Sequence, residues 1–262
     1  MLITSTSNEK IKDIKKLIAK ADYRKERGLF VVEGVRMVRE VPAERLQALF
    51  ISESLFERES KTYAHIPEDR LFTVKDSIFE GLSATKNPQG ILALVTIIEY
   101  NSYEFFEKAV LCERPFLFII EHLQDPGNLG TIIRTAEAGG VTGVLLSSDT
   151  VDLYNPKVIR STMGSVFRVP VLIAQDLFGE IEKIKKQHIE IFGAHLAGEP
   201  FYDKDFTGGC GFLIGNEGHG LSDRISEQAD TLIRIPMKGS VESLNAAVST
   251  AVIAYEVLRQ RR

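Results

Sequence analysis

The chain has 262 residues, of which 44% are hydrophobic and 26% charged, and its formal net charge at pH 7 is −4. These values are typical of a soluble globular protein and exclude a uniformly basic nucleic-acid-binding protein. There is no membrane-spanning apolar run, no signal-peptide core, and neither Cys112 nor Cys210 has disulfide-framework or zinc-ligand spacing. We therefore expect a cytoplasmic protein with two buried free thiols, no membrane contact and no metal.

The sequence pattern of residues 1–98 predicts a compact unit of helices and strands. Thr6–Glu9 has the pattern of a capping box, and apolar residues follow it at helical spacing. Short apolar runs bounded by turn residues predict the strands. These strands are expected at residues 29–34, 46–52, the start of 71–83, and 91–97.

A basic segment overlaps the first predicted helix. Residues 10–27 contain eight Lys or Arg and three acidic residues, a local balance of +5. The segment is either a solvated helix face or a surface that faces RNA. On the second interpretation, Arg24, Lys25 and Arg27 would contact RNA.

The pattern changes after residues 99–113, which we interpret as a linker between an N-terminal domain, 1–98, and a C-terminal domain, 114–262. Six mostly apolar runs follow, and helical stretches separate several of them. This arrangement is typical of an α/β domain whose parallel sheet is covered on both faces. The runs are residues 116–121, 141–147, 169–174, 189–196, 209–215 and 230–236.

Three polar, glycine-containing segments interrupt these runs, at residues 121–141, 212–222 and 235–257. In open α/β sheets, ligands bind outside the carboxyl ends of the strands, where we expect all three segments to lie. A dinucleotide-binding loop is excluded, because the glycines of "GCGFLIG" lie at the start of a strand and inside it. No phosphate-binding loop and no metal-ligand spacing of histidines is present.

The segments "DPGNLGTIIRTAEAGG", "FLIGNEGHGLS" and "IPMKGSVESLNAAVSTAVIAYE" occur in this order. They resemble the three sequence motifs of the SpoU (TrmH) family of RNA ribose 2′-O-methyltransferases, in the SPOUT superfamily, across about residues 114–262. More loosely, "FVVEGVRMVREV" and "SATKNPQGILA" resemble the substrate-binding domain that often precedes this catalytic domain. The resemblance implies a parallel sheet with a deep trefoil knot, an S-adenosylmethionine pocket within the knot, and a homodimer formed through the catalytic domain.

The resemblance also implies roles for individual residues. The cofactor pocket is expected to include Leu196, Gly215, Asn216, Gly218, Ile235, Met237 and Leu244. The polar active-site positions are Asn128, Arg134, Glu217, Ser243 and Asn245. Because a guanidinium stays protonated, Arg134 suits a grip on a phosphate or a developing oxyanion better than the role of general base.

A further candidate contact with RNA follows Pro156. Lys157 and Arg160 share one face if a helix begins there, near the mouth of the site, and this face either meets RNA or is merely solvated.

The resulting prediction is S-adenosylmethionine-dependent methylation of a ribose 2′-hydroxyl in structured RNA, with ribosomal RNA preferred over transfer RNA as the substrate. Two alternatives remain open: a non-catalytic RNA-binding protein that keeps the fold, and a small-molecule transferase.

Overall fold

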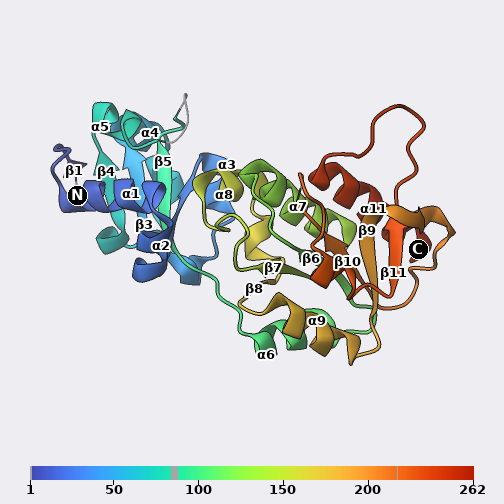
Figure 1. Ribbon diagram of the computed structural model, residues 1–262. Helices are drawn as coiled ribbons and strands as arrows, with labels where there is room; N and C mark the ends of the chain where they lie inside the picture. Colours follow the sequence, from blue (N-terminus) through green and yellow to red (C-terminus); the bar gives the residue numbers. More distant parts are fainter. Residues whose placement is uncertain (1, 84–87, 217) are drawn as a thin grey trace. The chain divides into compact units, whose positions relative to one another are not determined.

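The computed structural model describes residues 2–83, 88–216 and 218–262. The chain forms two compact units (Figure 1). Unit 1 contains the chain up to Ile98 together with Asp152–Phe167, and unit 2 contains Glu99–Val151 and Arg168–Arg262.

Unit 1 is built on a five-stranded mixed sheet in the order β1-β4-β3-β5-β2. Parallel pairing joins β1, β4 and β3, whereas β5 runs antiparallel to both β3 and β2. The four strands expected from the apolar runs are all present, and β1 is an additional short strand. The strands are β1 (Leu2–Ile3), β2 (Leu29–Glu33), β3 (Leu46–Ser52), β4 (Leu71–Val74) and β5 (Ile91–Thr96).

The helices of unit 1 are short, and α1 packs on the sheet because Ile11, Ile14 and Leu17 lie on one face and are buried. Asn8, and not Thr6, caps this helix, since its side chain accepts a 2.9 Å hydrogen bond from the Lys10 amide. The helices are α1 (Glu9–Ala19), α2 (Ala21–Arg27), α3 (Val35–Arg39), α4 (Glu53–Glu59), α5 (Asp76–Glu80) and α8 (Pro156–Thr162).

The segment Asp152–Phe167 packs in unit 1, although the sequence assigned it to the C-terminal domain. The Phe30 ring of β2 lies 4.7 Å from the Tyr154 ring and 6.3 Å from the Phe167 ring, measured between centroids. The Tyr154 hydroxyl also accepts a 3.0 Å hydrogen bond from the Ile98 amide and donates one to the Ile98 carbonyl. These contacts are distant in sequence, which is why no local pattern predicted them.

Arg24 is buried in unit 1, with 4% of its surface exposed. Its guanidinium forms an ion pair with Asp152 and donates to the carbonyls of Leu17 and Ile18 near the end of α1, at 2.5 and 3.2 Å. The prediction that Arg24 contacts RNA is therefore wrong, because every donor named here is turned inward. Its position in α2 directs it toward the carbonyls that α1 leaves unpaired.

Unit 2 contains a six-stranded, all-parallel sheet in the order β11-β9-β10-β6-β7-β8. Each of the six predicted apolar runs coincides with one of these strands, although β9 continues to Pro200, beyond its predicted run of 189–196. All five residues of β6, β7 and β10 are buried. This burial on both faces explains why the runs do not alternate. The strands are β6 (Phe116–Ile120), β7 (Gly143–Ser147), β8 (Val171–Ala174), β9 (Glu190–Pro200), β10 (Cys210–Ile214) and β11 (Thr231–Arg234).

Residues 99–113 are part of this unit and do not form a simple linker. Asn101 caps α6 with a complete capping box, and a turn of π-helix, Phe106–Val110, continues it. Phe105, Ala109 and Val110 enter the core, so the segment is held by apolar burial. The remaining helices are α6 (Ser102–Phe105), α7 (Pro126–Gly139), α9 (Leu177–Lys185), α10 (Asp223–Ser226) and α11 (Ala246–Gln260).

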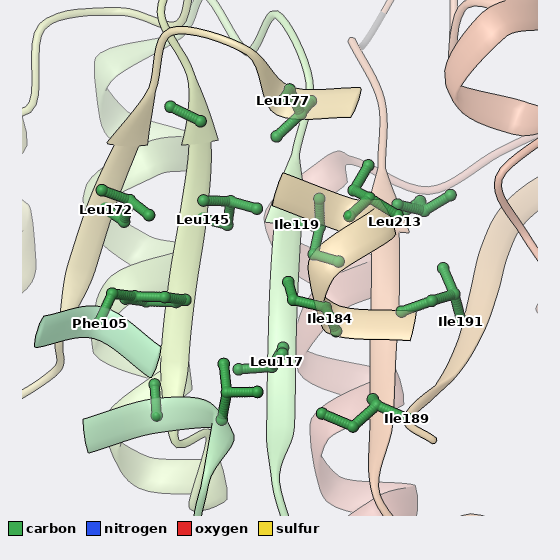
Figure 2. Close-up of a cluster of buried hydrophobic side chains, with 14 of the residues drawn as sticks. Phe105, Leu117, Ile119, Leu145, Leu172, Leu177, Ile184, Ile189, Ile191 and Leu213 are labelled. Atoms are coloured by element: carbon green, nitrogen blue, oxygen red, sulfur yellow. The ribbon is translucent and has the colours of Figure 1, made fainter. Parts of the chain in front are cut away.

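The core of unit 2 has a separate cluster on each face of the sheet. Figure 2 shows one face, where Leu117 and Ile119 of β6 lie among side chains of neighbouring strands and Ile184 of α9. An aromatic cluster includes Phe116, whose ring centroid lies 5.7 Å from that of Phe212. Alternation along β6 therefore sends successive side chains into two different cores.

Two further expectations concern cysteine and membrane segments. Cys210 is buried, and burial raises the pKa of its thiol to about 12, but Cys112 is exposed. The expectation of two buried thiols is therefore wrong for Cys112. Within the described part of the chain, no helix has both the length and the apolar character needed to cross a membrane.

We expect Arg24→Ala to lower the free energy of unfolding of unit 1 by about 3 kcal/mol, because the change removes the partner of Asp152 from a largely buried site. Hydrogen exchange of the β2 amides measures this local free energy. Arg27→Ala is the control, since Arg27 is exposed and lies 3.4 Å from Asp13, and should cost only about 0.5 kcal/mol. Equal effects of the two changes would contradict a structural role for Arg24.

Candidate active site

A cavity of about 460 Å³ lies at the carboxyl ends of β10 and β11 and beside the middle of β9, and residues at the start of α11 complete its wall. This is the edge at which ligands are expected in an open parallel sheet. All seven residues that the resemblance assigned to the cofactor line the cavity. They are Leu196, Gly215, Asn216, Gly218, Ile235, Met237 and Leu244.

An irregularity in β9 supplies one wall. The pairing with β11 passes from Gly193 opposite Leu232 directly to Glu199 opposite Ile233, so residues 194–198 bulge out of the ladder. Ala194, His195 and Leu196 of this bulge line the cavity. Leu196 is 62% exposed and so presents an apolar surface to whatever the cavity holds.

The glycine loop, defined as residues 215, 216 and 218–222, forms a second wall. Asn216 and Gly220 exchange two backbone hydrogen bonds of 2.9 Å, which makes the turn very tight. The Asn216 side chain accepts from the amides of Gly218 and His219, at 2.8 and 3.2 Å. A Cβ atom at Gly215 would lie only 2.2 Å from the carbonyl carbon of Gly220, so this position requires glycine.

The polar end of the site lies where α7 and α11 begin. Asn245 caps α11 by accepting from the amides of Ala247 and Val248, at 2.9 and 3.3 Å, and its amide group donates to Asn128 at 3.0 Å. Asp125, and not Asn128, caps α7, because the Asp125 side chain accepts from the Asn128 amide at 2.7 Å. The Asn128 side chain is thereby left to meet Asn245 across 117 positions of sequence.

The other predicted polar residues differ in their placement. Ser243 lines the cavity, and Glu217 lies outside the described residues. Arg134 is exposed on α7 and forms no hydrogen bond or ion pair with any residue that the structure describes. Glu137, three residues further along α7, forms an ion pair with Arg168 that includes one hydrogen bond of 3.1 Å. Arg134 therefore keeps its guanidinium available for another molecule.

A paired histidine lies at the end of β6. His122 Nδ1 is 2.8 Å from the Asp149 carboxylate, and the His122 carbonyl accepts a 2.9 Å hydrogen bond from the Asn216 side chain. The Ser147 hydroxyl, and less strongly the His122 imidazole, hold the pKa of Asp149 below its usual range. No described group of His, Cys, Asp and Glu side chains is arranged to hold a metal ion.

The residues predicted to contact RNA belong to unit 1. Lys25 and Arg27 are exposed on α2, and Lys157 and Arg160 are exposed on α8. The helix predicted after Pro156 is present, with Asn155 as its cap, and it places Lys157 and Arg160 one turn apart.

Sequence reasoning missed much of the cavity wall, which includes Ala194, His195, Ile214, His219, Gly220, Leu221, Ile233, Arg234, Glu242, Ala246, Ser249 and Ile253. Ser249 and Ile253 lie four and eight residues after Asn245, so helical spacing could have found them. The residues of the β9 bulge other than Leu196 gave no such signal.

Protein-family models match both the N-terminal and the C-terminal part of the chain. A model of the SpoU rRNA Methylase family matches residues 115–255, and a model of the MRM3-like substrate binding domain matches residues 8–93. The chain is 32% identical to the 23S rRNA (guanosine(2553)-2′-O)-methyltransferase RlmP of Bacillus subtilis (strain 168), over 97% of this chain and 98% of that protein.

Solved structures are similar over nearly the whole chain. The AdoMet-bound rRNA methyltransferase from Sinorhizobium meliloti has a TM-score of 0.84 at 27% identity and covers 99% of this chain and 97% of its own. The SpoU methyltransferase AviRb from Streptomyces viridochromogenes, in complex with AdoMet, has a TM-score of 0.84 at 26% identity, covering 97% and 98%. The fold, the cavity between its loops and these matches agree: the chain belongs to the SpoU rRNA methylase family.

Proposed function

We propose that this protein transfers the methyl group of S-adenosylmethionine to a ribose 2′-hydroxyl of ribosomal RNA. The observation that carries the proposal is the junction of the cavity with the Asn128–Asn245 pair at the start of α11. A cofactor in the cavity would have this polar pair close to it. The names of the relatives favour 23S ribosomal RNA as the first substrate to test, which also fits the predicted cytoplasmic location.

The cavity fits the cofactor in size and chemistry. Its volume lies in the range of small-molecule sites, and Leu196, Ile214 and Ile253 give it apolar walls of the kind that suits an adenine ring. Backbone groups of the glycine loop and of the residues after β11 supply polar contacts along its edge. When bound, the cofactor supplies a methyl group on a positively charged sulfur.

The chain's own residues contribute position and charge. Methyl transfer would replace the O–H bond of the ribose hydroxyl by an O–CH₃ bond, with the proton released to solvent and the thioether left as the second product, and the oxygen would carry negative charge where proton loss runs ahead of bond formation. Arg134 cannot accept that proton, because a guanidinium stays protonated in proteins. We assign it to a two-pronged grip on the target phosphate or on the developing oxyanion, and Asn128, Asn245 and Ser243 to orienting the ribose.

Unit 1 is proposed to hold the RNA. The match to a substrate-binding domain supports this, as do the exposed cations of α1, α2 and α8. Lys25, Arg27, Lys157 and Arg160 would contact phosphates, which bind RNA without reading its sequence.

The trefoil knot and the homodimer remain predictions. The order of β11, β9 and β10 in the sheet, followed by the return of the chain to α11 beside α7, supports the knot. Small residues allow α7 and α11 to approach closely, since a Cβ atom at Gly139 would lie 2.8 Å from that of Ala254. Val248 and Tyr255, 49% and 54% exposed, form a different face of α11, which we propose meets the second subunit.

We expect Gly215→Ala to abolish measurable binding of S-adenosylmethionine in titration calorimetry. The reason is the collision of the new Cβ atom with the Gly220 backbone, which would displace the glycine loop. Gly208→Ala is the matched control, because no atom lies within 4 Å of the Cβ position there. Unchanged affinity in Gly215→Ala would show that the cofactor does not depend on this loop.

We expect Arg134→Lys to slow single-turnover methylation of 23S ribosomal RNA about a hundredfold, while leaving cofactor affinity unchanged, because lysine keeps the charge but loses the planar fork. Lys25→Ala serves as the binding control: it should reduce the salt dependence of RNA binding by about one ion, and saturating RNA should restore the rate.

Methylation mapping in cells with and without the gene identifies the nucleotide. A wild-type protein that binds RNA and cofactor without methylation would favour the non-catalytic alternative.

We expect Tyr255→Asp to convert a dimer into a monomer in sedimentation analysis, because a charge would be placed in an apolar interface. Tyr103→Asp is the control, since Tyr103 is 73% exposed on α6. A wild-type protein that sediments as a monomer would remove the dimer from the proposal.

A further inference from the structure

Hydrogen bonds hold the glycine loop to the residues that follow β6 at three places. At its start, the Glu121 amide donates to the Ile214 carbonyl at 2.9 Å. Within it, the Asn216 side chain donates to the His122 carbonyl at 2.9 Å. At its end, both the amide and the hydroxyl of Ser222 donate to the Glu121 carboxylate, at 2.8 and 2.6 Å. Glu121 and His122, the two residues directly after β6, thus hold the beginning, the turn and the end of the loop.

The Glu121 carboxylate makes the strongest of these contacts. Hydrogen bonds to a charged acceptor are roughly twice as strong as neutral ones, and here both carboxylate oxygens are used on one residue. Ser222 also caps α10 by accepting from the Ile225 amide at 3.3 Å, and Ile225 is buried in the core of unit 2. The end of the loop is therefore held between the sheet and α10.

His122 acts on the loop through its backbone. Its φ of 51° is unusual for a residue other than glycine and costs about 1 kcal/mol. The conformation is held by the His122 amide, which donates to Ser147 at 2.9 Å, and by the imidazole, which contacts Asp149. The turned backbone brings the His122 carbonyl to Asn216, so a glycine at position 122 could make the same contact without strain.

We propose that Glu121 is a positioning residue for the cofactor site, which it holds in a binding-competent form through Ser222. His122 contributes its carbonyl group, and its imidazole is dispensable for cofactor binding. This inference rests on the proposed function, since it assumes that the cavity beside the glycine loop binds S-adenosylmethionine. Neither residue lines the cavity, so both act through the loop.

The first test compares Glu121→Gln with the wild-type protein. Because the amide loses the negative charge and presents one donor in place of an acceptor, we expect the Kd for S-adenosylmethionine to rise about tenfold in titration calorimetry. The KM for the cofactor should rise equally, while kcat at saturating cofactor and RNA should change less than about threefold, because Glu121 does not touch the reacting atoms. Exchange of the Ser222 amide hydrogen should also accelerate.

A double-mutant cycle tests the route of the effect. If Glu121 acts through Ser222, Glu121→Gln combined with Ser222→Ala should weaken binding no more than Glu121→Gln alone. His122→Gly should keep the wild-type Kd within about twofold, as its backbone suits the turn. Asp176→Asn is the matched control, because Asp176 caps α9 by accepting from the Gly179 amide at 3.1 Å and is not bonded to the glycine loop.

The outcomes separate this inference from the function on which it rests. A wild-type protein that does not bind S-adenosylmethionine would overturn the proposed function. A wild type that binds, together with a Glu121→Gln variant of equal affinity, would overturn the role of Glu121 alone. If Glu121→Gln does not fold, Ser222→Ala probes the same contact from the loop, and wild-type affinity in that variant would have the same meaning. A loss in His122→Gly as large as in Glu121→Gln would show that the imidazole matters.

Discussion

The parallel pairing of β10 with β6 is the contact on which the candidate site depends. Ile214 pairs with Ile120 at the last position of both strands, so both chains leave the sheet at the same level. The chain continues from β6 into Glu121 and from β10 into Gly215, so the loops that follow these two strands begin next to each other. Because β9 pairs with the other side of β10, its bulge reaches the same edge. The loops after β6 and β10 and the bulge of β9 therefore lie together at the edge where the cavity is found.

The same edge explains why backbone geometry is so constrained there. Gly215 has no room for a side chain. His122 adopts a left-handed backbone conformation, which is stabilised by contacts of its amide with the Ser147 hydroxyl and of its imidazole with the Asp149 carboxylate, and Ser147 in turn donates to Asp149. Such positions are costly in a loop that serves only as a connection. In a loop that lines a binding cavity, they keep the wall close to the ligand before it arrives, which reduces the ordering cost of binding.

Unit 1 depends on a different long-range contact. The chain passes between the units three times, because Asp152–Phe167 leaves unit 2 after β7, packs against β2 and returns before β8. Arg24 shows the consequence for function. In the basic segment of residues 10–27, the Arg24 side chain points inward and links α1 and α2 to Asp152, whereas Lys25 and Arg27 beside it are exposed. Charge along a sequence therefore overstates the charge available to a partner.

The sequence by itself determined every strand except β1, the parallel sheet of the C-terminal part and the three segments at the strand ends, because apolar runs and turn residues are local signals. By resemblance, it also identified seven residues that line one cavity. Only the tertiary structure decided that residues 99–113 are core, that Asp125 and not Asn128 caps α7, and that Arg24 is buried. It alone joined Glu121 to Ser222 and Asn128 to Asn245. The last two contacts pair residues 101 and 117 positions apart in the chain. At such separations the partner is chosen by sheet order and packing and leaves no periodic trace in the sequence.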